Sequence, residues 1–269
     1  MRSAPSDRVD AAERDHVCWA YNDAAALVDR AHDFLAAGIA AGDQVWYVAE
    51  APVPALAERL RAPAFRFVAL DSAYAARQPV EPAIRVSAYR AATERAMADG
   101  FHGLRVAADV TPLVRSAADL EAFARYEHLV DRYMTTAPLT GMCAYDRSVL
   151  GDRAIAELAC LHPLTNAPEV LFRLHAGTGA TVLAGELDPS NTDVFAAALE
   201  RADPPVVSGE IALDATHLTF IDHRALVALD GHARRRDAVV VLYTPLAAAG
   251  RLIGLLHLTN VQVRPAPGS

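Results

Sequence analysis

Strand-like and helix-like segments alternate along residues 16–161, and this alternation constrains the fold more than any other feature. Short apolar runs of strand length lie at 16–21, 44–49, 65–70, 104–109 and 139–145. Segments with apolar residues at helical spacing lie at 24–40, 54–61, 83–99, 119–133 and 152–161. Strands that alternate with helices in this way form parallel sheets with crossover helices, so the sequence predicts an α/β sandwich.

A second, smaller α/β domain is predicted after residues 163–169. Two prolines in this segment disfavour a helix and indicate an extended connection. The predicted organisation is a disordered tail over 1–14, a first domain over 15–165 and a second domain over 166–269. In the second domain we expect strands at 170–176, 181–188, 210–213, 238–243 and 256–263, and helices at 191–201, 224–235 and 247–253.

Composition excludes several classes of protein. The formal net charge is −8, and the basic excess that phosphate binding needs is missing, so we expect no nucleic-acid partner. No apolar run reaches the length of a membrane span, so we expect no membrane association and a cytoplasmic location. Three cysteines without CxxC spacing indicate reduced, buried thiols rather than disulfides or a zinc site.

The first domain lacks the usual catalytic and phosphate-binding motifs. A P-loop, a GxGxxG turn after the first strand, GxSxG and HExxH are all absent. Because ligands of such folds bind beyond the carboxyl ends of the strands, polar residues there are candidates, although most such residues cap helices. The candidate ligand-binding residues are His16, Tyr21, Glu50, Asp109 and His162. We assign no catalytic residue, no metal ligand and no cofactor, because the histidines have no partner at ligand spacing.

Five ordered segments of the first domain carry a family resemblance. These are DHVCWAY, FLAAGIAAGDQVWYVAE, GLRVAADVTPLV, ARYEHLVDRY, and MCAYDRSVL followed by LHP. Together they resemble a MEDS domain, a sensory domain of methanogen and methylotroph regulators. The resemblance implies a degenerate RecA/KaiC-like parallel-sheet fold that senses a small organic molecule.

The segment 206–226, VVSGEIALDATHLTFIDHRAL, carries a second resemblance. It predicts a buried strand, a polar turn and then a helix capped by Asp222. With GELD on an earlier strand, this order resembles a STAS domain, the fold of anti-sigma factor antagonists. In that family a phosphorylated serine or threonine commonly follows the last Asp, but this chain has His223 there. The candidate partner-binding residues are Asp214, Thr219, Asp222, His223 and Arg224.

The two resemblances favour a cytoplasmic signalling regulator. In this interpretation the first domain senses a small organic molecule, and the second binds an anti-sigma factor or a related regulatory kinase. A homodimer is compatible with the sequence. Two alternatives stay open: an enzyme, which requires His16, Glu50, Asp109 and His162 to converge in one pocket, and a scaffold that binds no small molecule.

Overall fold

A computed structural model describes residues 16–74 and 80–265. The predicted disordered tail, 1–14, lies outside the described residues. The chain divides into two compact units, Met1–Pro168 and Glu169–Ser269. The division falls three residues after the predicted boundary at 165/166.

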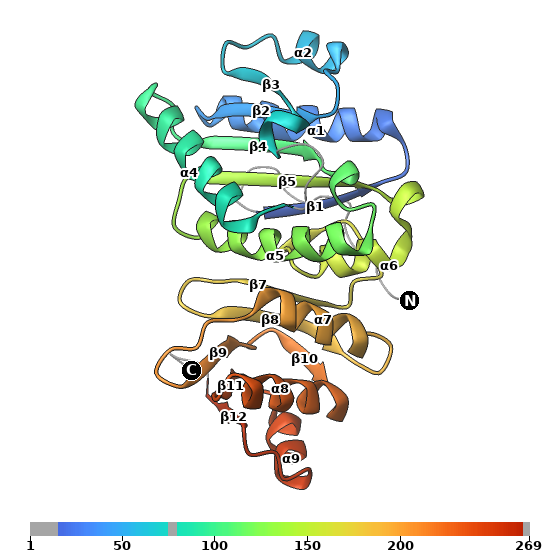
Figure 1. Ribbon diagram of the computed structural model, residues 1–269, viewed down its shortest axis with the longest axis vertical. Helices are drawn as coiled ribbons and strands as arrows, with labels where there is room; N and C mark the ends of the chain where they lie inside the picture. Colours follow the sequence, from blue (N-terminus) through green and yellow to red (C-terminus); the bar gives the residue numbers. More distant parts are fainter. Residues whose placement is uncertain (1–15, 75–79, 266–269) are drawn as a thin grey trace. The chain divides into compact units, whose positions relative to one another are not determined.

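The first unit is built on a six-stranded parallel sheet (Figure 1). Its strands are β1 (His16–Tyr21), β2 (Gln44–Ala49), β3 (Phe65–Ala69), β4 (Leu104–Asp109), β5 (Leu139–Asp146) and β6 (Leu164–Thr165). They lie in the order β3-β2-β4-β5-β1-β6. Its helices are α1 (Ala24–Ala40), α2 (Pro54–Leu60), α3 (Leu70–Ala73), α4 (Pro82–Ala98), η1 (Thr111–Leu113), α5 (Ala117–Met134) and α6 (Arg147–Ala159). The predicted α/β sandwich with a parallel sheet is therefore confirmed for this unit.

The two faces of this sheet have different characters. Helix α1 packs on one face, where Val17, Val45 and Ala107 belong to an apolar core cluster. Helices α4 and α5 pack together over the other face (Figure 1). Because side chains alternate along a strand, His16 points to the face opposite Val17. That second face holds the buried polar groups described below.

Several local predictions in the first unit differ from the structure. Helix α6 begins at Arg147 rather than 152, because Asp146 caps it and accepts a hydrogen bond from the Ser148 amide at 2.9 Å. The helix is interrupted at Gly151, whose φ of 76° is non-helical, so only its later part matches the predicted 152–161. The short elements α3, η1 and β6 were not predicted from the sequence.

The second unit contains a mixed six-stranded sheet. Its strands are β7 (Phe172–Ala176), β8 (Thr181–Leu187), β9 (Glu210–Asp214), β10 (Leu218–Ile221), β11 (Val239–Tyr243) and β12 (Val261–Arg264). Its helices are α7 (Thr192–Ala202), α8 (His223–Arg235) and α9 (Ala247–Leu255). The sheet order is β10-β8-β9-β11-β12, with parallel pairs, and β7 pairs with β8 antiparallel.

Two strands of the second unit differ from the sequence-based prediction. Strand β10 lies where a polar turn was expected, and the last strand is shorter than predicted. We expected a strand over 256–263, but α9 continues to Leu255 and β12 begins only at Val261. Between them Leu256 caps the helix and His257 adopts a left-handed φ of 51°, which no strand residue has. Asn191 lies at the start of α7 but makes no side-chain capping bond there. Its amide instead donates to the Glu186 carbonyl at 2.9 Å.

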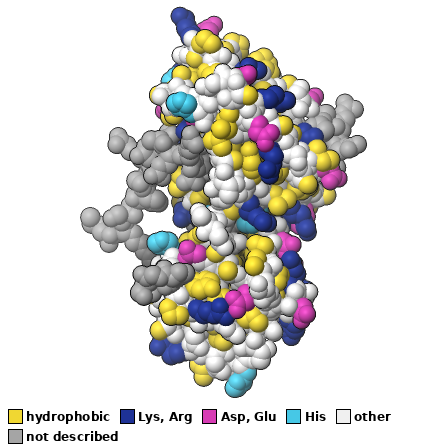
Figure 2. All heavy atoms as spheres, turned by 90° about the vertical axis from the view of Figure 1, so that its left-hand side faces the viewer, with side chains coloured by type: hydrophobic (Ala, Val, Ile, Leu, Met, Phe, Trp, Pro, Cys, Tyr) yellow, Lys and Arg dark blue, Asp and Glu magenta, His cyan; other side chains and the backbone are white. Residues whose placement is uncertain are grey.

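Surface charge is mixed in sign. The basic side chains other than histidine are all arginines. On the face shown in Figure 2, arginine and acidic side chains are interspersed with apolar ones. Among the helices of the described residues, none is both long enough and apolar enough to cross a membrane.

Candidate functional site

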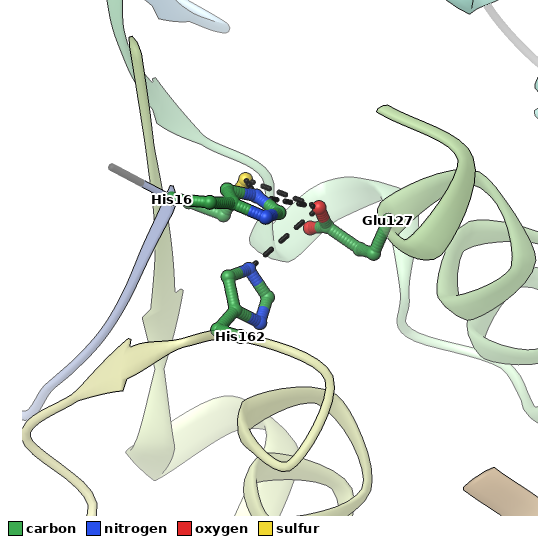
Figure 3. A group of neighbouring side chains, drawn as sticks. His16, Glu127 and His162 are labelled. Carbon is green, nitrogen blue, oxygen red and sulfur yellow. Dashed lines mark hydrogen bonds and ion pairs between the residues drawn. The ribbon is translucent and has the colours of Figure 1, made fainter. Parts of the chain in front are cut away.

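Four side chains with strong donor or acceptor atoms meet in the interior of the first unit. They are His16 on β1, Glu127 on α5, Cys143 on β5 and His162 in the turn after α6. The ligating atoms of the four all lie within 4.8 Å of one another. His16, Glu127 and His162 reach from different elements toward a common point (Figure 3). We call this group the His16 cluster.

Glu127 lies at the centre of the His16 cluster. One carboxylate oxygen, Oε2, lies 3.1 Å from His16 Nε2 and 3.6 Å from His162 Nε2. The Cys143 thiol donates to the same oxygen at 3.5 Å, and the Tyr145 hydroxyl donates a short hydrogen bond to the other oxygen. The Glu127 side chain has no exposed surface. A buried carboxylate needs such donors, because desolvation without them is costly.

The second nitrogen of each imidazole also has a fixed partner. His16 Nδ1 lies 3.2 Å from Asp131 Oδ1, and Asp131 follows Glu127 by one turn on α5. His162 Nδ1 lies 3.0 Å from the Leu158 carbonyl oxygen. A carbonyl only accepts hydrogen bonds, so His162 Nδ1 carries the proton and Nε2 presents a lone pair to the cluster. The two rings pack with centroids 4.1 Å apart.

Burial and the neighbouring groups raise the pKa of some members of the His16 cluster and lower the pKa of others. Burial alone would lower the pKa of His16, but hydrogen bonds to Asp131, Cys143 and Glu127 outweigh it and raise that pKa well above its usual value. Burial and the neighbouring His16 lower the pKa of His162 to about 4. Burial would raise the pKa of Glu127, yet His162, His16 and the Tyr145 hydroxyl lower it to about 2. Burial and Glu127 raise the pKa of the Cys143 thiol to about 12.

A small cavity adjoins the His16 cluster. Its volume is about 20 Å³, and its lining includes His16, Cys143, Tyr74, Tyr89 and Tyr126, with Met134 and Gly141 completing one wall. The Tyr74 hydroxyl lies 3.1 Å from that of Tyr89 and 3.4 Å from that of Tyr126. A volume of this size holds about one water molecule. Most of the remaining lining of the cavity is apolar. A mostly apolar cavity with a few convergent polar groups has the usual composition of a binding pocket.

The five predicted ligand-binding residues fall into separate places. His16 and His162 meet in the buried cluster. Tyr21 donates to Asp109 Oδ2 at 3.1 Å at the carboxyl edge of the sheet, and Asp109 also accepts from the Thr111 hydroxyl. His16 and Tyr21 are five residues apart on one strand, about 17 Å. Glu50 is exposed in the bend after β2. The convergence that the enzyme alternative required therefore involves only two of its four residues.

Sequence reasoning missed Glu127, Asp131 and the role of Cys143. No metal ligand was assigned from the sequence, whereas the structure brings together two imidazoles, a carboxylate and a thiol that could hold a metal ion. A signal was present in α5, because Glu127 and Asp131 lie four residues apart on a face that also carries Phe123 and Ala124. Acidic residues on the buried face of an amphipathic helix need partners, which points to basic or metal-binding groups opposite.

The predicted partner-binding residues surround the junction of β10 and α8 in the second unit. Asp222 caps α8 and accepts a hydrogen bond from the Ala225 amide at 2.8 Å, as predicted from the sequence. His223 and Arg224 are exposed in the first turn of the helix. The Thr219 hydroxyl donates to the Gly185 carbonyl at 3.0 Å. Asp214 accepts from the amide and hydroxyl of Thr216 and so shapes the preceding loop.

The fold places the first unit in the class of parallel α/β domains with helices on both faces of the sheet. The family model of the MEDS domain, the methanogen/methylotroph, DcmR sensory domain, matches residues 15–163. This match covers more than half of the chain, so the protein belongs to the MEDS family, as the sequence resemblance indicated. Membership indicates a role in sensing or signalling. Comparisons with curated proteins and with solved structures give no match.

Proposed function

We propose that this protein is a signalling regulator in which the MEDS unit senses a small organic molecule and the second unit binds a regulatory protein. The observation that carries the proposal is the buried, mostly apolar cavity with a few polar groups, inside a unit that matches a sensory family. The first unit has a degenerate RecA/KaiC-like fold in this proposal, and its all-parallel sheet supports that assignment.

The cavity limits the class of ligand. Its walls are mostly apolar, and hydroxyl, imidazole and thiol groups offer hydrogen bonds at a few points. A small organic molecule with one polar group matches this lining. At about 20 Å³ the cavity admits such a molecule only if side chains move, and Met134 is the flexible member of the wall. Ligand entry would therefore change the packing of α5, which carries Met134, Tyr126 and Glu127.

Gly141→Ala is expected to raise the Kd for the ligand at least about tenfold, which is a loss of about 1.4 kcal/mol in binding free energy. The added Cβ would lie 2.7 Å from Met134 Cε, a movable side-chain end, so the variant should fold while the wall loses space. Calorimetric titration with one- to three-carbon alcohols, aldehydes and acids measures the effect. Gly250→Ala is the matched control, because its Cβ meets nothing within 4 Å. If no compound binds the wild-type chain, or Gly141→Ala binds equally well, the cavity is not the sensing site.

The second unit is proposed to be a STAS-like domain that binds an anti-sigma factor or a related kinase. Strand β10, with the sequence LTFI, leads directly into the Asp222-capped helix α8, so the LTFID segment precedes a helix as it does in the resemblance. Phe220 and Val227 flank this turn and are 48% and 50% exposed, so apolar surface lies beside the charged Arg224. An apolar anchor next to an arginine is a common composition of protein-binding surfaces.

Phe220→Ala combined with Arg224→Ala is expected to reduce capture of the partner at least about tenfold, since both side chains are exposed and their loss removes contacts without disturbing the core. The measurement is affinity capture from cell extract with the full chain as bait, followed by identification and quantification of captured proteins by mass spectrometry. Leu255→Ala is the control, because Leu255 is 75% exposed on α9, away from this turn in sequence. Capture of no anti-sigma factor or regulatory kinase by the wild-type chain would contradict the assignment.

A further inference from the structure

Four of the six donor separations in the His16 cluster are close to those of a tetrahedral metal site, and all six are within 4.8 Å. Donors that each lie about 2.0–2.3 Å from a zinc ion are about 3.3–3.7 Å from one another. The separations from Glu127 Oε2 are 3.1 Å to His16 Nε2, 3.5 Å to the Cys143 sulfur and 3.6 Å to His162 Nε2. The Cys143 sulfur lies 3.7 Å from His16 Nε2. Small movements would bring all four donors onto one ion.

One buried nitrogen in the cluster is oriented as a metal ligand would be. His162 Nε2 is fully buried and has no hydrogen-bond partner among the described residues. Its lone pair faces the Glu127 carboxylate oxygen 3.6 Å away, because Nδ1 donates to the Leu158 carbonyl. A nitrogen lone pair and a carboxylate oxygen that face each other at this distance repel each other electrostatically unless a positively charged or hydrogen-donating group lies between them. A metal ion between them would satisfy both.

The hydrogen bonds that hold the four side chains from outside the donor set also resemble those found around metal sites. Metal-binding histidines almost always use their second ring nitrogen to bind a carboxylate or a backbone carbonyl, which fixes the ring. His16 does so with Asp131, and His162 does so with the Leu158 carbonyl. The Tyr145 hydroxyl bonds to the oxygen of Glu127 that does not face the imidazoles. Each of three ligands is thus oriented by a residue outside the donor set.

We propose that His16, Glu127, Cys143 and His162 bind one divalent transition-metal ion in tetrahedral geometry. Two imidazoles, a thiolate and a carboxylate form a mixed donor set for which zinc is the best-matched ion. Binding releases two protons, one from the Cys143 thiol and one from His16 Nε2. The ion then links β1, β5, α5 and the turn after α6 beside the cavity. This inference does not rest on the proposed function, because a structural ion would occupy the same site.

Cobalt binding to the full chain tests the proposal. We expect about one equivalent of zinc in protein purified without chelator. After chelation, one equivalent of Co²⁺ should produce strong visible absorption of tetrahedral cobalt and a near-ultraviolet thiolate-to-cobalt band. Cys143→Ser should remove the thiolate band. Cys160→Ser is the matched control, since Cys160 is also buried but lies outside the donor set, and the cobalt spectrum of this variant should not change.

Two measurements keep the test decisive if the Cys143 variant does not fold. The wild-type spectrum alone reports both geometry and thiolate ligation. Glu127→Gln keeps the size of the side chain and its contact with Tyr145, and should weaken Co²⁺ binding at least about tenfold. A folded wild-type chain that binds no Co²⁺, or binds it with the weak absorption of octahedral cobalt and no thiolate band, overturns the proposal. The cluster would then be a metal-free hydrogen-bonded network around Glu127.

Discussion

Asp43→Ala is expected to destabilise the first unit by about 3–5 kcal/mol, because it breaks an ion pair between two buried side chains. Arg105 on β4 is 2% exposed, and its Nε lies 3.4 Å from Asp43 Oδ2. The guanidinium also lies 5.0 Å from the ring centre of Phe34, so the rest of its surroundings is partly aromatic. The loss can be measured by urea unfolding monitored by tryptophan fluorescence. Both tryptophans, Trp19 and Trp46, lie in the first unit, so the signal reports that unit alone.

Two further variants separate the charge effect from loss of packing. Combining Asp43→Ala with Arg105→Met removes both charges and keeps an unbranched side chain, so it should be less destabilising than Asp43→Ala alone. Asp29→Ala breaks an ion pair with Arg59 whose side chains are 70% and 40% exposed, and should cost less than about 1 kcal/mol. Equal losses for Asp43→Ala and Asp29→Ala would show that the buried pair contributes little.

The fold of the first unit could be predicted from local patterns in the sequence. The bounds predicted for β1, α1, β2 and β4 agree with the structure residue for residue. Each is a short apolar run or an amphipathic segment ended by a polar cap or glycine, so its limits depend on nearby residues. The 256–263 segment shows where this fails. Leu255 and Leu256 are apolar, yet they are exposed at the end of α9 rather than buried in a strand.

The His16 cluster could be predicted only in part, because its members are distant in sequence. His16 and His162 were candidates as histidines, but the sequence gives no reason to bring them together. Cys143 is 127 residues from His16, and they meet because β1 and β5 are neighbours in the sheet. The strand order that makes them neighbours is a property of the whole unit, which local periodicity does not specify. Glu127 reaches the cluster because α5 packs on the same face of the sheet as His16.

Gly185→Ala is expected to destabilise the second unit by roughly 2–6 kcal/mol, the sum of backbone strain and overpacking. Gly185 has a φ of 91°, and a Cβ there would lie 2.2 Å from the Leu171 carbonyl oxygen, a backbone atom that cannot move independently. At this residue β8 pairs with both β7 and β10. The Gly185 carbonyl also accepts a hydrogen bond from the Thr219 hydroxyl, and the Gly185 amide donates one to the His217 carbonyl. The substitution should therefore disturb the strand that precedes α8.

Gly179→Ala is the matched control for this effect. Gly179 has nearly the same φ, 92°, but a Cβ there meets nothing within 4 Å, so only strain of about 1–2 kcal/mol is expected. Hydrogen exchange of peptides from β8 and β10 measures the loss, and tryptophan fluorescence should stay unchanged because the second unit has no tryptophan. Partner capture should fall with Gly185→Ala and persist with Gly179→Ala, because only the former reaches Thr219. Equal hydrogen exchange in Gly185→Ala and Gly179→Ala would contradict this prediction. It would mean that β7 moves to accommodate the contact with Leu171, and that the β10–α8 turn does not depend on Gly185.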